Sequence, residues 1–264
     1  MRMEHIYPAF ERGRIMKKEL LWALRDYACS ALQIKYLKYA NGILSGCGIH
    51  PEGSTLRIAP GMIKCADFIF LITGEETISY TPTGEYTSLK FRLKEREELP
   101  DYTRYLTEFV LDESLERNSN EVELCRFKLK EGAVLRTEYK DFYDIQTEYD
   151  TVNLAGATWS CAGQNTLSKD ITDYFAQKVL ECEKAEEHDI QFAYFLLQGQ
   201  EAADYRILTD YIRRKTGESV QDVRKISTEE AFEKLVDILD GIRRGTGTYR
   251  NNGSSAERRM IVWE

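Results

Sequence analysis

The side chains that could do nucleophilic chemistry are a cysteine and a histidine far apart in the sequence. Cys161 lies in the short segment Trp159–Gly163, and His188 and Asp189 stand at the predicted start of a helix. Cysteine catalysis needs a thiolate held beside a base. No catalytic pattern surrounds Cys161, and Asp189 suits the positive end of a helix dipole. We therefore predict no catalytic residues for this chain.

Metal-binding groups also lack the spacing that their chemistry requires. The six cysteines include no Cys-x-x-Cys pair and the three histidines are far apart, whereas zinc sites use paired ligands at short spacing. One short acidic segment could ligate calcium through Asp141, Asp144, Glu148 and Asp150. It lacks the glycine and the terminal glutamate of an EF-hand loop. We predict no metal site and interpret the cysteines as reduced, mostly buried thiols.

A nucleotide site is equally poorly supported. Gly245 and Gly247 form a Gly-x-Gly pair, but the pair follows a predicted helix instead of joining a strand to one. The phosphate-loop pattern GxxxxGK[ST] does not occur in the sequence. We therefore expect no cofactor.

Composition and charge limit the partners. Of 264 residues, 42% are hydrophobic and 30% charged, which is typical of a folded domain. The formal net charge of -8 has the wrong sign for a general nucleic-acid binder. The longest apolar runs, Phe68–Ile72 and Ala193–Leu197, are far shorter than the roughly 20 residues of a membrane helix. The N-terminus has no apolar core of a secretory signal, so we expect a protein made and assembled in the cytoplasm.

The spacing of apolar residues predicts an α+β fold with an N-terminal helix, a central antiparallel β-domain (a sandwich or open barrel) and a C-terminal helical region. Residues 1–41 form the N-terminal helical segment, since Leu20, Leu24 and Tyr27 recur at helical spacing. A break near Cys29, or a strand over Leu32–Tyr36, is an alternative there. We assign residues 42–160 to the β-rich domain, 161–245 to the helical domain and 246–264 to a flexible tail.

Local signals support these assignments. Alternating apolar and polar residues predict five strands, at Phe68–Ile72, Thr77–Thr81, Tyr86–Leu93, Tyr105–Leu111 and Glu121–Leu129. Ser168 can cap a helix, and Ser227 with Glu230 forms a capping box. Gly42, Gly46 and Gly61 are expected to be structural turn residues, at least one of them at positive φ or at a close backbone approach.

Aromatic residues are the candidates for an interface. The chain has 16 tyrosines, and tyrosine is enriched at protein interfaces because it joins a large area to a polar tip. We predict Tyr80, Tyr86 and Tyr105 of the β-domain and Trp263 of the tail as interface anchors. Ordinary sheet packing is the alternative for the tyrosines, and folding back onto its own core is the alternative for Trp263.

Two segments resemble a known class of structural proteins. Residues 42–64, GILSGCGIHPEGSTLRIAPGMIK, resemble the small β-modules of phage tail, baseplate and fibre-attachment proteins. Glu121–Asp144 is similar to a stretch that follows the β-module in several prophage structural proteins, with a Gly-Ala turn at Gly132 and Ala133. The chain as a whole looks like a prophage or tail-like-particle structural protein.

This resemblance implies a non-enzymatic assembly subunit of a phage tail or contractile tail-like particle, at the baseplate periphery or as a fibre-attachment adaptor. It implies other tail or baseplate proteins as partners, a homo-oligomer, and residence in the bacterial cytoplasm during assembly and then in the virion or particle. The alternative is an enzyme or small-ligand-binding protein whose site is assembled from distant residues, such as Asp141, Asp144, His188 or Cys161.

Overall fold

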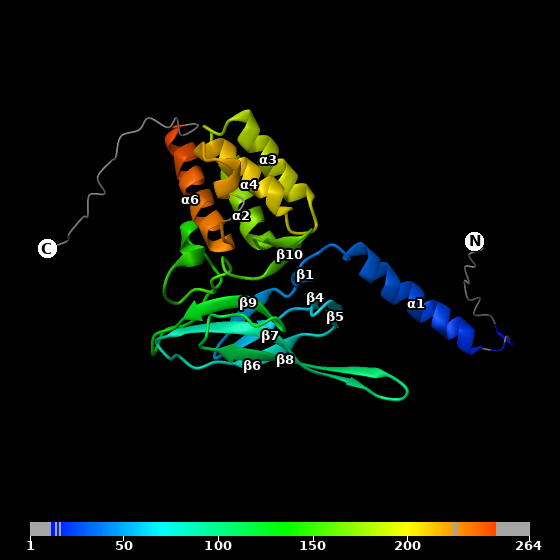
Figure 1. The fold of residues 1–264 in the computed structure, drawn as a ribbon. Coiled ribbons are helices and arrows are strands. Elements are labelled where there is room, and N and C mark those ends of the chain that lie inside the picture. Colours follow the sequence, from blue (N-terminus) through cyan, green and yellow to red (C-terminus); the bar gives the residue numbers. More distant parts are fainter. Residues whose placement is uncertain (1–11, 14, 16, 224–225, 247–264) are drawn as a thin grey trace, which may run out of the picture.

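The computed structural model describes residues 12–13, 15, 17–223 and 226–246. The fold is α+β, with an N-terminal helix, central antiparallel sheets and C-terminal helices, as the sequence predicts (Figure 1). The helices are α1 (Lys18–Lys35), α2 (Lys169–Leu180), α3 (Glu187–Gln198), α4 (Tyr205–Thr216), the short α5 (Val220–Val223) and α6 (Thr228–Arg244), with a 3₁₀ turn η1 (Tyr143–Gln146). In the described part, no helix is long and apolar enough to cross a membrane.

The strands form three sheets. Their bounds are β1 (Gly42–Gly46), β2 (Ile49–Glu52), β3 (Thr55–Ile58), β4 (Gly61–Cys65), β5 (Phe68–Ile72), β6 (Glu76–Ser79), β7 (Tyr86–Glu98), β8 (Thr103–Asp112), β9 (Glu121–Lys128), β10 (Trp159–Cys161) and β11 (Gln164–Thr166). The sheet orders are β11-β10-β1-β4-β5, β2-β3-β6 and β8-β7-β9. All five predicted strands are present, and β7 and β8 continue past the body as a projecting hairpin (Figure 1).

The three sheets share one apolar core. Leu56, Ile63, Leu89 and Val122, which together represent all three sheets, are fully buried in it. The period-two alternation of these strands places their apolar side chains on this common face. One pairing differs from the antiparallel expectation, because β10 lies parallel to β1 through Ile43 and Trp159. The sheet also continues to Thr166 in β11, beyond residue 160, where we expected the β-rich domain to end.

The helices after β11 enclose a second core. Ile171, Phe175, Phe232 and Leu235 are fully buried in it. The Ser168 hydroxyl accepts a hydrogen bond from the backbone N–H of Ile171, and the capping box at the start of α6 is formed, so both predicted caps are confirmed.

The N-terminal helix is unbroken. It runs from Lys18 through Cys29 to Lys35. The alternatives of a break near Cys29 or a strand over residues 32–36 are therefore wrong. The helix predicted from the spacing of Leu20, Leu24 and Tyr27 is confirmed.

Candidate functional site

Helix α1 leads away from the body and covers no part of either core (Figure 1). None of its residues is buried. It nevertheless carries large apolar side chains, and these are exposed to solvent: Tyr27 is 69% exposed and Ile34 is 74% exposed. Solvent-exposed apolar surface that is contiguous marks interaction sites more often than scattered single residues do. We therefore treat α1 as the candidate interaction element.

The C-terminal end of α1 is anchored on one side by a buried lysine of β4. The Lys64 ammonium donates hydrogen bonds to the carbonyl oxygens of Tyr36 at 3.1 Å and Tyr39 at 2.7 Å. The carbonyl oxygen of Leu37 also accepts from it, at 3.5 Å. The last carbonyls of a helix have no intrahelical partner and carry partial negative charge. A cation there satisfies them and holds the helix end against the sheet.

A carboxylate anchors the same helix end from the other side. Glu201, in the loop between α3 and α4, accepts hydrogen bonds from the hydroxyls of Tyr39 at 2.8 Å and Tyr36 at 3.2 Å, and its carboxylate lies 2.6 Å from the Lys35 ammonium. Burial alone would raise the pKa of Glu201, but the hydrogen bonds from Lys35 and Tyr39 outweigh it and lower the pKa. Burial, followed by the bond to Glu201, raises the pKa of Tyr39 to about 12.

We call this arrangement of Lys64 and Glu201 around Lys35, Tyr36 and Tyr39 the α1 anchor. The anchor engages the polar groups at the base of the helix and does not bury Leu24 or Ile34, which are 49% and 74% exposed. An arm that is fixed at one end and apolar along its length can present a surface in a defined direction.

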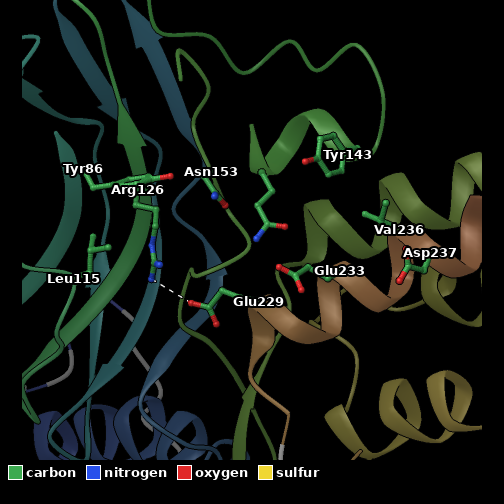
Figure 2. Close-up of a pocket in the computed structure, with 10 residues that line it drawn as sticks. Tyr86, Leu115, Arg126, Tyr143, Asn153, Glu229, Glu233, Val236 and Asp237 are labelled. Atoms are coloured by element: carbon green, nitrogen blue, oxygen red, sulfur yellow. Dashed lines mark ion pairs between the residues drawn. The ribbon is translucent and has the colours of Figure 1, made fainter. Parts of the chain in front are cut away.

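A second candidate is a cleft of about 600 Å³ between the β-body and α6 (Figure 2). Glu229, Glu233 and Asp237 follow one another along one side of α6 and give this wall of the cleft its negative charge. Tyr86 and Tyr143 supply aromatic surface on the facing elements (Figure 2). The ten described lining residues include no histidine, cysteine, serine or lysine, so their ionisable groups are three carboxylates, two tyrosine hydroxyls and one guanidinium.

Among the described lining residues of the cleft, the one cation, Arg126, is already paired. The guanidinium of Arg126 on β9 contacts Glu123 through two hydrogen bonds, of 2.7 and 2.9 Å, and approaches Glu229 at 3.3 Å (Figure 2). Burial alone would lower the pKa of Arg126, but the carboxylates of Glu123 and Glu229 outweigh it and raise the pKa. The guanidinium packs on Gly156, where an added Cβ would lie 2.4 Å from it. Arg126 thus joins the β-body to α6.

The three predicted turn glycines lie where β1 meets its neighbours. Gly42 has φ +153° and Gly46 has φ +67°. A Cβ on Gly46 would lie 2.2 Å from the carbonyl oxygen of Pro60, and one on Gly61 would lie 2.5 Å from the backbone nitrogen of Cys47. In the β1–β4 ladder Gly46 pairs with Gly61. Side chains at this crossing would push the two strands apart.

The predicted interface aromatics occupy different environments. Tyr80 is 5% exposed, packs edge-to-face on Phe127 and donates its hydroxyl to the carbonyl of Gly53, so its ring belongs to the chain's own core. Tyr86 is half-buried at the cleft. Tyr105 is half-buried as well and stacks on Phe68 with ring centroids 4.3 Å apart. Trp263 lies outside the described residues.

The nucleophile candidates have structural contacts instead of catalytic ones. The Cys161 thiol, in β10, points to the carbonyl of Gln164 at 3.3 Å, and burial raises its pKa. Asp189 closes the capping box of α3 and accepts a hydrogen bond from the Tyr211 hydroxyl at 2.8 Å. His188 packs its ring beside the ring of Tyr211. The structure does not assemble these residues around a common space.

Three of the four acidic residues considered for calcium, namely Asp141, Asp144 and Glu148, are engaged internally. The Asp144 carboxylate binds both terminal nitrogens of the Arg136 guanidinium, at 2.6 and 2.8 Å, and these bonds hold its pKa well below the usual range. Asp141 accepts from the backbone N–H of Asp144, and Glu148 pairs with Lys128. Within the described ranges, no group of three or more His, Cys, Asp or Glu side chains is placed to hold a metal ion.

Comparison with known proteins gives only distant structural likenesses. No protein-family model and no curated protein matches the chain. Among solved structures, "Crystal structure of TssK" matches with 10% identity and TM-score 0.39 over 97% of this chain and 73% of that chain. A chain of the TssK-TssF-TssG baseplate subcomplex of the type VI secretion system matches with 9% identity and TM-score 0.43, over 91% of this chain and 100% of that one. A chain of "The baseplate complex from the type VI secretion system" matches with 10% identity and TM-score 0.39, over 91% and 70%. Likenesses at these values assign neither family nor function.

Proposed function

We propose that this protein is a non-enzymatic structural subunit of a phage tail or contractile tail-like particle, placed at the baseplate periphery or as a fibre-attachment adaptor. The observation that carries the proposal is α1, an arm with a fixed base and no buried residue, whose apolar side chains Leu24 and Ile34 are 49% and 74% exposed. The resemblance of residues 42–64 and 121–144 to tail and prophage structural proteins supplies the class of assembly.

The anchor supports an assembly role in a specific way. Lys64 and Glu201 come from β4 and from the α3–α4 loop, so both parts of the body hold the base of α1. A helix held by two parts of the body presents its surface with little loss of freedom on binding, which favours stable association. The described cleft lining of Figure 2 has no histidine, cysteine, serine or lysine, and its acidic groups are the carboxylates of Glu229, Glu233 and Asp237.

Further contacts belong to the same proposal. We assign neighbouring tail or baseplate proteins as partners, with Tyr86 and Tyr105 as the β-domain tyrosines that keep some exposed surface. Trp263, beside Ile261 and Val262, is proposed to dock on a neighbour as an apolar end to a polar tail. The protein would be made in the bacterial cytoplasm and then reside in the particle.

The test is purification of particles from the bacterial cells that carry the gene, with the gene intact, deleted, or shortened by residues 253–264. We expect the intact chain to co-sediment with tail-like particles in a fixed ratio, seen by mass spectrometry and electron microscopy. The deletion strain should lack complete particles. Complete particles without this protein would overturn the proposal. Normal particles from the shortened gene would overturn only the docking of Trp263.

A further inference from the structure

The apolar residues of α1 repeat with alternating steps of four and three. Leu20, Leu24, Tyr27, Ala31 and Ile34 form this series, which we call the α1 seam. Such spacing is the heptad pattern of a helix that packs along another helix. We propose that the α1 seam pairs with the α1 seam of a second copy of this chain. The pairing deepens the proposed function and rests on it only in treating α1 as an assembly surface.

Two positions of the seam, Leu24 and Ile34, are widely exposed, whereas Leu20 is half-buried. Leu24 is 49% exposed, and Tyr27 and Ile34 are exposed further. Helix α1 has 18 residues, and no side chain caps its start at Lys17. In proteins, most of the stability of a helix comes from packing of its apolar face. Burial of the seam against a partner supplies the stabilisation that the body does not.

The charge pattern favours a second copy as the partner. The positions that flank the seam within α1 are mostly uncharged, at Leu21, Ala23, Ala28 and Ser30, with Lys35 at the anchored end as the exception. Charged flanking residues of like sign would repel when two identical helices meet. Two copies of α1 can therefore approach along most of the seam without repulsion between like charges, and Lys35 is paired with Glu201 of its own chain.

Apart from Lys35, the charges of α1 lie on its outer side and have both signs. Arg25 and Asp26 are paired there at 2.6 Å, and Glu19 stands next to Lys18. The Lys18 ammonium lies 4.6 Å from the centre of the Trp22 ring, so this exposed tryptophan also has a contact on the outer side. A helix that lies on an anionic membrane carries a polar face rich in lysine and arginine. The mixed outer face of α1 favours a second copy over a lipid surface.

The first experiment measures association of the full chain by light scattering across a dilution series. We expect the wild-type chain to have the mass of two or more copies. Leu24→Glu places a charge in the seam of every copy and should raise the dissociation constant at least about 100-fold. Gln33→Glu adds the same charge on the exposed outer side. It should leave the dissociation constant within about threefold, since the outer side does not contact the second copy in the proposed pairing.

The second experiment locates the contact by disulfide formation under mild oxidation, in a Cys29→Ser background. Ala31→Cys alone should cross-link two copies if the helices are parallel, and the pair Leu20→Cys with Ala31→Cys should do so if they are antiparallel. Wild-type Cys29 is exposed on the outer side and should not cross-link. No cross-link in either arrangement, with association intact, would show that another surface joins the copies.

Besides the absence of a cross-link, three outcomes would overturn the pairing. They are a monomeric wild-type chain at about 100 µM, which is weaker than most specific associations, equal effects of Leu24→Glu and Gln33→Glu, and a monomer that sediments with phosphatidylserine vesicles through α1. A wild-type monomer in solution that is found in purified particles would refute the pairing and leave the proposed function standing. A chain that pairs in solution but is absent from particles would refute the proposed function and leave the pairing standing.

Discussion

Helices α1 and α6 are nearly the same length, 18 and 17 residues, and both are amphipathic. They differ in what covers the apolar side. Helix α6 buries six residues in the second core, namely Ala231, Phe232, Leu235, Ile238, Leu239 and Ile242, whereas α1 buries none. The same sequence pattern therefore serves a core in one case and an open surface in the other.

The ends of the two helices differ in the same sense. Helix α6 carries its own caps, with the Ser227–Glu230 capping box at its start and Gly245 in the left-handed conformation at its end. Helix α1 has no side-chain cap at its start and depends on Lys64 and Glu201 of the body at its end. A helix that completes its own core supplies its own terminal partners, whereas the arm takes them from the body that holds it.

The largest expected effect tests whether α6 and α1 differ in how far their apolar side chains are buried. Phe232→Ala removes a fully buried ring of α6 and should lower the free energy of unfolding by about 3–5 kcal/mol. Leu24→Ala removes a half-exposed side chain of α1 and should change it by less than about 0.5 kcal/mol. Denaturation in urea measures both, at dilutions where copies do not associate. A comparable cost for Leu24→Ala would show that the α1 face is covered within one copy.

The sequence predicts both helices but not the difference between them. Apolar spacing reports that one side of a helix is apolar and says nothing of what lies against it, so Leu24 and Leu235 have the same local signal. The caps at Ser168 and Ser227 were predictable because each acts on a residue three positions away. Period-two alternation placed the strands for the same local reason.

The anchor was not predictable because its parts are distant in sequence. Lys64 lies in an apolar strand and Glu201 in a loop, and neither has a spacing that points to Tyr36 or Tyr39. Arg126 of the cleft was missed likewise, since it alternates with apolar residues as any sheet residue does. The burial of Tyr80 depends on which face of the sheet meets the core, which its strand pattern alone does not decide.

A smaller effect is expected where the anchor rests on the sheet. Lys64 reaches α1 only because β4 lies close beside β1, and Gly46 permits that approach. In Gly46→Val the new side chain collides with the Pro60 carbonyl oxygen, and valine is strained at the positive φ of this position. The substitution should therefore lower the free energy of unfolding by about 1–3 kcal/mol. Gly74→Val is the matched control, because its Cβ would meet nothing within 4 Å. Equal melting of the two variants would show that the crossing tolerates a side chain.

The smallest effect tests whether the polar contacts of Glu201 stabilise α1 alone and leave α6 unchanged. Glu201→Gln removes the charge that accepts the hydroxyls of Tyr36 and Tyr39. The carboxylate and Lys35 are partly exposed, so we expect a loss of only about 1 kcal/mol, confined to the base of α1. Hydrogen exchange should therefore speed up about fivefold at the amides of Tyr36 and Tyr39. Amides of α6 should exchange as in the wild type.

Acid should produce the same local change in the wild-type chain. The pKa of Glu201 is lowered from its ordinary value of 4.5, so its contribution is present above that value and is lost as the pH falls through the lowered pKa. Exchange at Tyr36 and Tyr39, corrected for the intrinsic rate, should rise in that acid range in the wild type and stay level in Glu201→Gln. Glu233→Gln, which removes an exposed carboxylate of α6, is the matched control and should behave as the wild type. If acid or Glu201→Gln loosened α6 as much as the base of α1, the arm and the core helix would be held by one common network, and the contrast between them would be wrong.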